Sequence, residues 1–363
     1  MKTTLLKIIY GSIFCILLPL GFIAWARFVE PVIQIPVPGN SIVALSLIIA
    51  GIILMLIAMY NLWRLGKGLP MNAFPPEQYV SKGAYKYFHH PIYVAAVLLC
   101  FGISMYFKSA AGFWLISPLL IIMIIAYVVG FENEIISKAF NNKKHKTFFD
   151  LPEANNNRPS VKSKLLVFVW VYIPWFVLYE LFIFIGEPKD AVNTFLPPDN
   201  YIPYLDYSVI FYLLSYPFAL LIPFIIKSNR QLREFIQQLA WGMIIIFLCY
   251  FIFPFVAHHA VPPSGSIFYK LIIAGRETDG IAAALPSFHV FWALISFYHF
   301  SKSYPKLKTV FAMIAALITI SCVTTKNHSI VDVVSALIVY IIVININTIY
   351  TAILRSCESI SNS

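Results

Sequence analysis

Charged side chains are scarce in this chain of 363 residues. They make up 12% of it, whereas hydrophobic residues make up 60%. In a soluble domain about a quarter of the residues are normally charged. The deficit therefore excludes an ordinary soluble globular protein and indicates that lipid surrounds most of the chain.

Cysteine is also rare, and the chain lacks internal repeats of fixed period and low-complexity tracts. The five cysteines are Cys15, Cys100, Cys249, Cys322 and Cys357. Their spacing matches no disulfide or metal-binding pattern, and most of them lie in apolar stretches, where cysteine behaves as a small hydrophobic residue. We therefore expect neither a disulfide framework nor a metal site.

What the chain does contain is apolar residues in blocks of about 20, the length that a helix needs to cross a bilayer. The blocks are roughly residues 5–27, 41–63, 91–107, 111–130, 163–186, 207–226, 236–257, 286–300, 308–323 and 329–352. They predict an all-α polytopic membrane protein with about ten transmembrane helices. The first block resembles a signal peptide, but its apolar run is longer than usual for one, so we expect it to be retained.

The net charge of +10 follows the predicted topology. If the N-terminus is cytoplasmic and each block crosses once, 20 of the 26 Lys and Arg residues fall on the inner side. This is the positive-inside rule, and it explains the basic excess without a nucleic-acid-binding face. We expect a multi-pass protein of the cell membrane with both termini cytoplasmic, a membrane lipid as its partner and no nucleic acid.

The segment 141–164 is polar, rich in Asn and Lys, and contains Pro152 and Pro159. It separates the first four apolar blocks from the last six, as a module boundary would. The sequence therefore predicts two modules, residues 1–155 and residues 156–363.

Two polar clusters open apolar blocks in the second module. Residues 285–289 (Leu-Pro-Ser-Phe-His) open the eighth block, and residues 324–332 (Thr-Thr-Lys-Asn-His-Ser-Ile-Val-Asp) open the tenth. The charge-derived topology places both clusters at the outer membrane face. One histidine at a helix end is commonly an interfacial residue or a cap. Two such motifs at the same face favour a functional site, because ionisable groups are costly there.

The residue types in these clusters suit metal-independent phosphoryl transfer. His328 and Asp332 are four residues apart and share one helical face, so the carboxylate can orient the imidazole as a nucleophile. His289 would protonate a leaving alkoxide and then activate water or an acceptor hydroxyl. Lys326 and Ser287 would hold the phosphoryl oxygens, although Lys326 could instead extend toward the membrane surface.

Both clusters resemble signatures of the type 2 phosphatidic acid phosphatase (PAP2) superfamily. The Thr-x-Lys-x-His pattern from Thr324 is most similar to the lipid phosphotransferase-like branch, which includes sphingomyelin and inositol phosphorylceramide synthases. The resemblance covers roughly 205–352 and implies a six-helix bundle. It also implies His328 as the nucleophile, Asp332 as its orienter and His289 as the acid and base.

The sequence departs from this family in three places. The Ser-Arg pair of the third signature is Ser321-Cys322 here, and the first signature, a Lys followed seven residues later by Arg-Pro, is absent. Lys270 and Arg276 are six residues apart without a following proline, and we retain both as candidate phosphate-binding residues. Residues 261–264 (Val-Pro-Pro-Ser) resemble a Pro-Pro-Arg element but lack its arginine.

A different pattern occupies the first module. Residues 83–93 (Gly-Ala-Tyr-Lys-Tyr-Phe-His-His-Pro-Ile-Tyr) and the Glu-rich stretch from Glu132 resemble isoprenylcysteine carboxyl methyltransferases and phospholipid methyltransferases. The resemblance covers roughly 45–150 and implies a four-helix module with a cytoplasmic-side pocket for S-adenosylmethionine. The residues that it assigns to the cofactor are His90, Pro91, Tyr93 and Glu132.

This match is incomplete. His89 stands where the family has Arg, and Asn133 where it commonly has a second Glu. A neutral imidazole cannot replace the bidentate contact of Arg with a carboxylate. The aromatic and histidine residues could instead form an interfacial belt.

Three functions follow in order of preference. The first is an integral membrane lipid phosphatase or phosphotransferase that acts through a phosphohistidine at the outer face. The second is an S-adenosylmethionine-dependent methyltransferase that acts on a lipid or prenylated substrate at the cytoplasmic face. The third is a non-enzymatic scaffold for lipid binding or transport.

Overall fold

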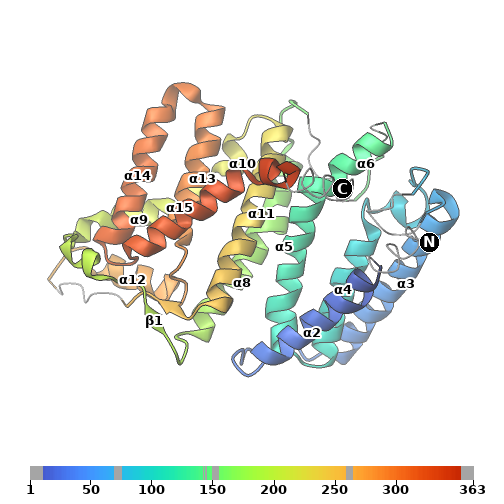
Figure 1. Ribbon diagram of the computed structural model, residues 1–363, viewed down its shortest axis with the longest axis horizontal. Helices are drawn as coiled ribbons and strands as arrows, with labels where there is room; N and C mark the ends of the chain where they lie inside the picture. Colours follow the sequence, from blue (N-terminus) through green and yellow to red (C-terminus); the bar gives the residue numbers. More distant parts are fainter. Residues whose placement is uncertain are drawn as a thin grey trace, which may run out of the picture. The chain divides into compact units, whose positions relative to one another are not determined.

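The computed structural model describes residues 11–68, 76–141, 143, 145–148, 155–258 and 265–352. The chain divides into two compact units, Met1–Leu151 and Pro152–Ser363. Both consist almost entirely of helices, as Figure 1 shows. The boundary between the units lies within the polar segment 141–164.

The described residues of the first unit form four main helical runs. They are α2 (Leu18–Val29), which follows η1 (Ile13–Leu17); α3 (Ser41–Gly66); α4 (Pro91–Tyr106), which follows η2 (Gly83–Lys86); and a run made of η3 (Gly112–Ile116), α5 (Ser117–Tyr127), η4 (Val128–Glu132) and α6 (Asn133–Ala139). The Asn40 side chain accepts hydrogen bonds from the first N–H groups of α3 and so fixes its start. Glycines at Gly51 and Gly102 let α3 and α4 pack closely.

The second unit is a larger helical bundle with one minimal sheet. Its long helical runs are α7 (Val161–Val167), η5 (Phe168–Tyr172) and α8 (Ile173–Ile185); α9 (Val209–Leu220) and α10 (Ile222–Ile225); α11 (Asn229–Ile252); α12 (Tyr269–Asp279); α13 (Phe288–Ser303); η8 (Pro305–Leu307) and α14 (Lys308–Thr324); and α15 (Ile330–Ile344). Between α8 and α9 lie β1 (Val192–Asn193), η6 (Pro197–Tyr201) and η7 (Asp206–Ser208). β1 pairs in parallel with β2 (Phe255–Val256), which follows α11.

Helix α13 forms the centre of this bundle. It packs against α9, α11, α14 and α15, and Figure 1 shows α13 beside α14 and α15. Large aromatic side chains fill the core around it; the ring of Trp292 stacks on that of Tyr172 with centroids 5.3 Å apart. Since α13 is surrounded along its length, the residues at its N-terminal end are held rigidly.

The prediction of an all-α membrane protein is confirmed, but the predicted count of about ten transmembrane helices is not. Within the described residues five helices are long and apolar enough to cross a membrane, or six if the bent pair at the end is one span. They are Ser41–Gly66, Gly112–Ala139, Val161–Ile185, Asn229–Ile252 and Pro305–Thr324, with Ile330–Ile344 and Ile346–Ala352 as the pair. The other predicted blocks contain shorter helices; α9 has 12 residues and α13 has 16.

We predict that Gly242→Ala destabilises the second unit. A Cβ atom at Gly242 would lie 2.1 Å from Cζ of Phe291, whose side chain is fully buried, so α11 and α13 would have to move apart. Overpacking of this kind costs about 1–3 kcal/mol. Thermal unfolding of the purified protein in detergent measures the loss. The matched control is Gly275→Ala, because a Cβ atom there meets nothing within 4 Å; equal stability of the two variants would contradict the packing argument.

Candidate functional site

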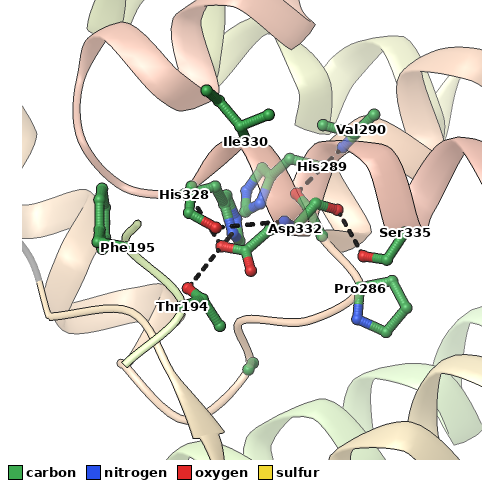
Figure 2. A network of polar contacts seen from close by, with 12 residues as sticks. Thr194, Phe195, Pro286, His289, Val290, His328, Ile330, Asp332 and Ser335 are labelled. Atoms are coloured by element: carbon green, nitrogen blue, oxygen red, sulfur yellow. Dashed lines mark hydrogen bonds and ion pairs between the residues drawn. The ribbon is translucent and has the colours of Figure 1, made fainter. Parts of the chain in front are cut away.

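His328 and Asp332 form a pair at the start of α15 (Figure 2). A capping box fixes this start, because Ser329 and Asp332 exchange hydrogen bonds between side chain and backbone. The capping places Oδ2 of Asp332 3.4 Å from Nδ1 of His328. The Thr194 hydroxyl, from the segment after β1, donates to the same oxygen at 3.3 Å. The carboxylate is thus held against one ring nitrogen and leaves the other available for chemistry.

His289 is the second residue of α13, and the start of this helix places it beside the pair. The Ser287 hydroxyl caps that helix by accepting from the Val290 N–H. The backbone N–H of Ser287 donates to the carbonyl oxygen of Asp332 at 3.1 Å and so joins the beginnings of α13 and α15. As a result, the rings of His289 and His328 lie with centroids 5.6 Å apart, and both side chains are buried.

A second carboxylate, Asp279 at the end of α12, also contacts His289. Its Oδ2 lies 3.6 Å from Nε2 of His289. Two tyrosines of α9, Tyr212 and Tyr216, donate their hydroxyls to the carboxylate at 2.6 Å and 2.5 Å. Asp279, Tyr212 and Tyr216 belong to none of the sequence motifs, so the motifs did not place them at the site.

Arg276, one turn before Asp279, supplies positive charge beside His328. Its Nε donates to Oδ1 of Asn327 at 3.0 Å, and its Nη2 donates to the carbonyl of Thr325 at 2.9 Å. Burial lowers the pKa of the guanidinium from its ordinary value, yet arginine remains charged in proteins. Arg276, Asn327 and His328 line one small cavity. A phosphoryl group in this cavity would meet a cation and an imidazole together.

The other three predicted phosphate-binding residues are placed differently. The Lys326 ammonium donates to the carbonyls of Asp199 and Ile202 at 2.5 Å and 2.7 Å. The left-handed backbone at Lys326 (φ 57°) lies in the turn that precedes His328. The hydroxyl of Ser287 accepts at the start of α13 and its N–H donates to α15, and Lys270 is exposed on α12. The predicted element at 261–264 lies outside the described residues.

The segment that Lys326 contacts is itself attached to the site. Asp199 is buried, and its Oδ1 accepts from the N–H of Ile330, the first residue of α15, at 2.8 Å. Its Oδ2 accepts from the Leu196 N–H at 2.8 Å. Asp199 belongs to none of the sequence motifs and lies in a proline-rich loop. We name residues 191–206 the strap; it holds the start of α15 through Thr194 and Asp199.

The four residues predicted to bind a cofactor come together in the first unit. Nδ1 of His90 lies 3.3 Å from Oε2 of Glu132, and its Nε2 lies 3.2 Å from Oδ1 of Asn133. The ring of Tyr93 stacks on that of His90, and Pro91 begins α4. Glu132 is buried at the end of η4. The Glu132 carboxylate and the His90 imidazole thus lie side by side, and the Tyr93 ring stacks on the imidazole.

The glycine of the same motif is required by its surroundings. Gly83 has a left-handed backbone (φ 63°), which other residues rarely adopt. A Cβ atom there would lie 2.2 Å from Nδ2 of Asn61 on α3. Nearby, burial, with Glu132 as a second cause, raises the pKa of Tyr85 far above its ordinary value. The motif loop is therefore packed tightly against α3.

Comparison with known proteins agrees with this division. No curated protein and no solved structure gives a significant match to the chain. Residues 40–143 match the family model for phospholipid methyltransferase, and residues 201–346 match the model for the PAP2 superfamily. Both resemblances inferred from the motifs are confirmed, each in its predicted module. The chain is thus a membrane protein whose first part is similar to phospholipid methyltransferases and whose second part is similar to the PAP2 superfamily, a combination that supports an enzyme of lipid modification.

Proposed function

We propose that the second unit is a lipid phosphatase or phosphotransferase that works through a phosphohistidine on His328. The observation that supports this proposal most is the cavity where His328 and Arg276 meet, with Asp332 on the Nδ1 side of the His328 ring. A nucleophile, its orienting carboxylate and a cation for the phosphoryl oxygens are then within one site. His289 stands beside the nucleophile as acid and base.

In the first step, Nε2 of His328 attacks phosphorus while Asp332 accepts the hydrogen bond of Nδ1–H. The N–P bond forms as the bond from phosphorus to the lipid alkoxide breaks. His289 gives a proton to the leaving oxygen, and Arg276 balances the charge of the phosphoryl oxygens.

In the second step, His289 takes a proton from water or from an acceptor hydroxyl. The resulting oxygen nucleophile attacks phosphorus, the N–P bond breaks, and His328 is regenerated. A phosphatase and a phosphotransferase therefore use the same residues and differ in the acceptor. Binding of a hydroxylated lipid in place of water would select transfer.

We place this site at the outer face of the cell membrane, with both termini cytoplasmic. The proposal rests on the distribution of basic residues, which concentrates them in the loops opposite His289 and His328. A lipid of the outer leaflet would then bring its phosphate to the cavity from the side, while its tail stays among the helices.

We predict that His328→Ala and His289→Ala each abolish phosphate release from a lipid phosphate, while the protein still inserts into the membrane. Asp332→Asn should lower the rate by about 10⁴-fold, because the amide cannot hold the His328 ring in the productive tautomer. Phosphate release from phosphatidic acid in vesicles, with membrane insertion checked by fractionation, measures these effects. Unchanged activity of His328→Ala would contradict the mechanism.

The two candidate cations are distinguished by a second pair of variants. Arg276→Gln should raise KM for the lipid phosphate and lower kcat, because the guanidinium lines the cavity. Loss of a charge-assisted hydrogen bond to phosphate costs about 1.5–3 kcal/mol, or about 10- to 100-fold. Lys270→Gln should have a smaller effect, since Lys270 is exposed. A larger loss in the Lys270 variant would assign phosphate binding to that residue instead.

A second candidate function belongs to the first unit, and the contact of His90 with Glu132 favours it. S-adenosylmethionine, when bound, would supply an electrophilic methyl group. The buried Glu132 carboxylate suits the cationic amino group of that cofactor, and Tyr93 and Pro91 could pack against it. His89 does not suit its carboxylate, because a neutral imidazole makes no bidentate contact. We propose a lipid or prenylated acceptor at the cytoplasmic face.

We predict that the full-length protein binds labelled S-adenosylmethionine and that Glu132→Gln and His90→Ala weaken this binding at least tenfold, the loss expected when a buried charged contact is removed. Glu134→Gln is the matched control, because Glu134 is exposed and pairs with Lys138. Equilibrium binding to purified protein measures the effect. Absence of binding would contradict the methyltransferase function. If phosphoryl transfer and methyl transfer were both absent, the remaining function would be a scaffold for lipid binding or transport.

A further inference from the structure

Asp279 is a buried carboxylate that no motif includes. We propose that it is the positioning residue of His289, coupled to both ring nitrogens through Tyr212 and Tyr216. The site then contains two histidine–carboxylate pairs with different tasks: Asp332 orients the nucleophile, and Asp279 serves the acid and base. The inference rests on the phosphoryl-transfer function proposed above and assigns a further residue to it.

The geometry around His289 is nearly symmetrical. The Tyr212 hydroxyl lies 3.3 Å from Nδ1 and the Tyr216 hydroxyl lies 3.3 Å from Nε2. Both hydroxyls bind the same carboxylate, on Oδ2 and Oδ1. The ring of Tyr212 also stacks on the imidazole with centroids 4.2 Å apart. Each nitrogen of His289 is therefore linked to Asp279 by one tyrosine.

The direction of these hydrogen bonds indicates which form of His289 the cluster stabilises. An ionised carboxylate only accepts, so both tyrosines donate their single proton to Asp279. Their oxygens can then only accept from His289, which requires a proton on each ring nitrogen. These directions suit the imidazolium. Burial of His289 acts against the charged ring, and the negative charge of Asp279 at 3.6 Å acts in its favour.

The position of the cluster connects it to the reaction. Tyr212 and Asp279 line the same cavity as His328 and Arg276. A buried carboxylate is costly unless it is paired and hydrogen-bonded, and here a third tyrosine, Tyr179, adds a weaker contact at 3.4 Å. Packing alone would not require a charge at this position, since an uncharged residue of the same shape would avoid that cost.

The chemical consequence concerns the leaving group. When the N–P bond forms on His328, the imidazolium of His289 gives one proton to the departing alkoxide and becomes neutral. When water later attacks the phosphohistidine, His289 takes one proton back. Asp279 and both tyrosines are unchanged over the cycle. Loss of the Asp279 charge should therefore slow formation of the phosphohistidine only when the leaving oxygen needs a proton.

The test compares two phosphate esters on the full-length protein. The leaving group of phosphatidic acid is an alkoxide, which needs a proton. The leaving group of p-nitrophenyl phosphate is nitrophenolate, which departs without one. The variant is Asp279→Asn, which keeps the shape and a hydrogen-bond acceptor. The control is Glu277→Gln, an exposed carboxylate on the same helix. Rapid-mixing measurements give the first turnover separately from the steady state.

We expect Asp279→Asn to lower the first-turnover rate on phosphatidic acid by about 100-fold, the usual contribution of a general acid. On p-nitrophenyl phosphate the same variant should retain its burst of nitrophenolate and then turn over slowly, because the acid-labile phosphohistidine accumulates. Tyr216→Phe should show the same pattern with a smaller loss. Glu277→Gln should match the unmodified protein on both esters.

Two results would overturn the inference while leaving the proposed function intact. An equal loss of first turnover on both esters would show that Asp279 only supports the fold of the site. Unchanged turnover on phosphatidic acid would show that His289 does not depend on it. No burst and no phosphohistidine in the unmodified protein would instead contradict the phosphoryl-transfer function, and the inference with it.

Discussion

The hydrogen bond from the Ser287 N–H to the Asp332 carbonyl is the contact on which the site depends. It joins the first turns of α13 and α15, two helices whose starts are far apart in the sequence. Each start has its own serine cap, at Ser287 and Ser329. Neither helix can shift along its axis without breaking the bond between Ser287 and Asp332. The 5.6 Å separation of the two imidazole rings follows from this junction.

Hydrogen-bond donors from several elements stabilise the charged groups inside this apolar bundle. Burying a carboxylate is unfavourable unless donors surround it. Asp332 receives a backbone N–H and the Thr194 hydroxyl, and Asp279 receives tyrosine hydroxyls from α9. The donors come from other elements, so the polar site and the packing of the bundle stabilise each other. Removal of one donor would affect both.

The sequence was sufficient to predict the membrane class and the resemblance to two families, because both depend on local patterns such as the histidine motifs. The count of about ten membrane helices is not confirmed, since within the described residues an apolar block such as 207–226 contains a helix of only 12 residues before Leu221. Lys326 was expected at the phosphate, but its ammonium binds the Asp199 and Ile202 carbonyls. The contact of Asp279 with His289 depends on the tertiary arrangement of α9, α12 and α13, which no spacing in the sequence reveals.

The strap extends the proposed site beyond the residues that match the PAP2 superfamily. The PAP2 superfamily match begins at residue 201, whereas Thr194 and Asp199 precede it. The strap also includes β1, which pairs with β2 beyond α11. A fragment cut at the family boundary would keep every motif histidine, yet it would lose a donor to Asp332 and the acceptor at the first N–H of α15. The boundary of the family match and the boundary of the proposed site are therefore different places in this chain.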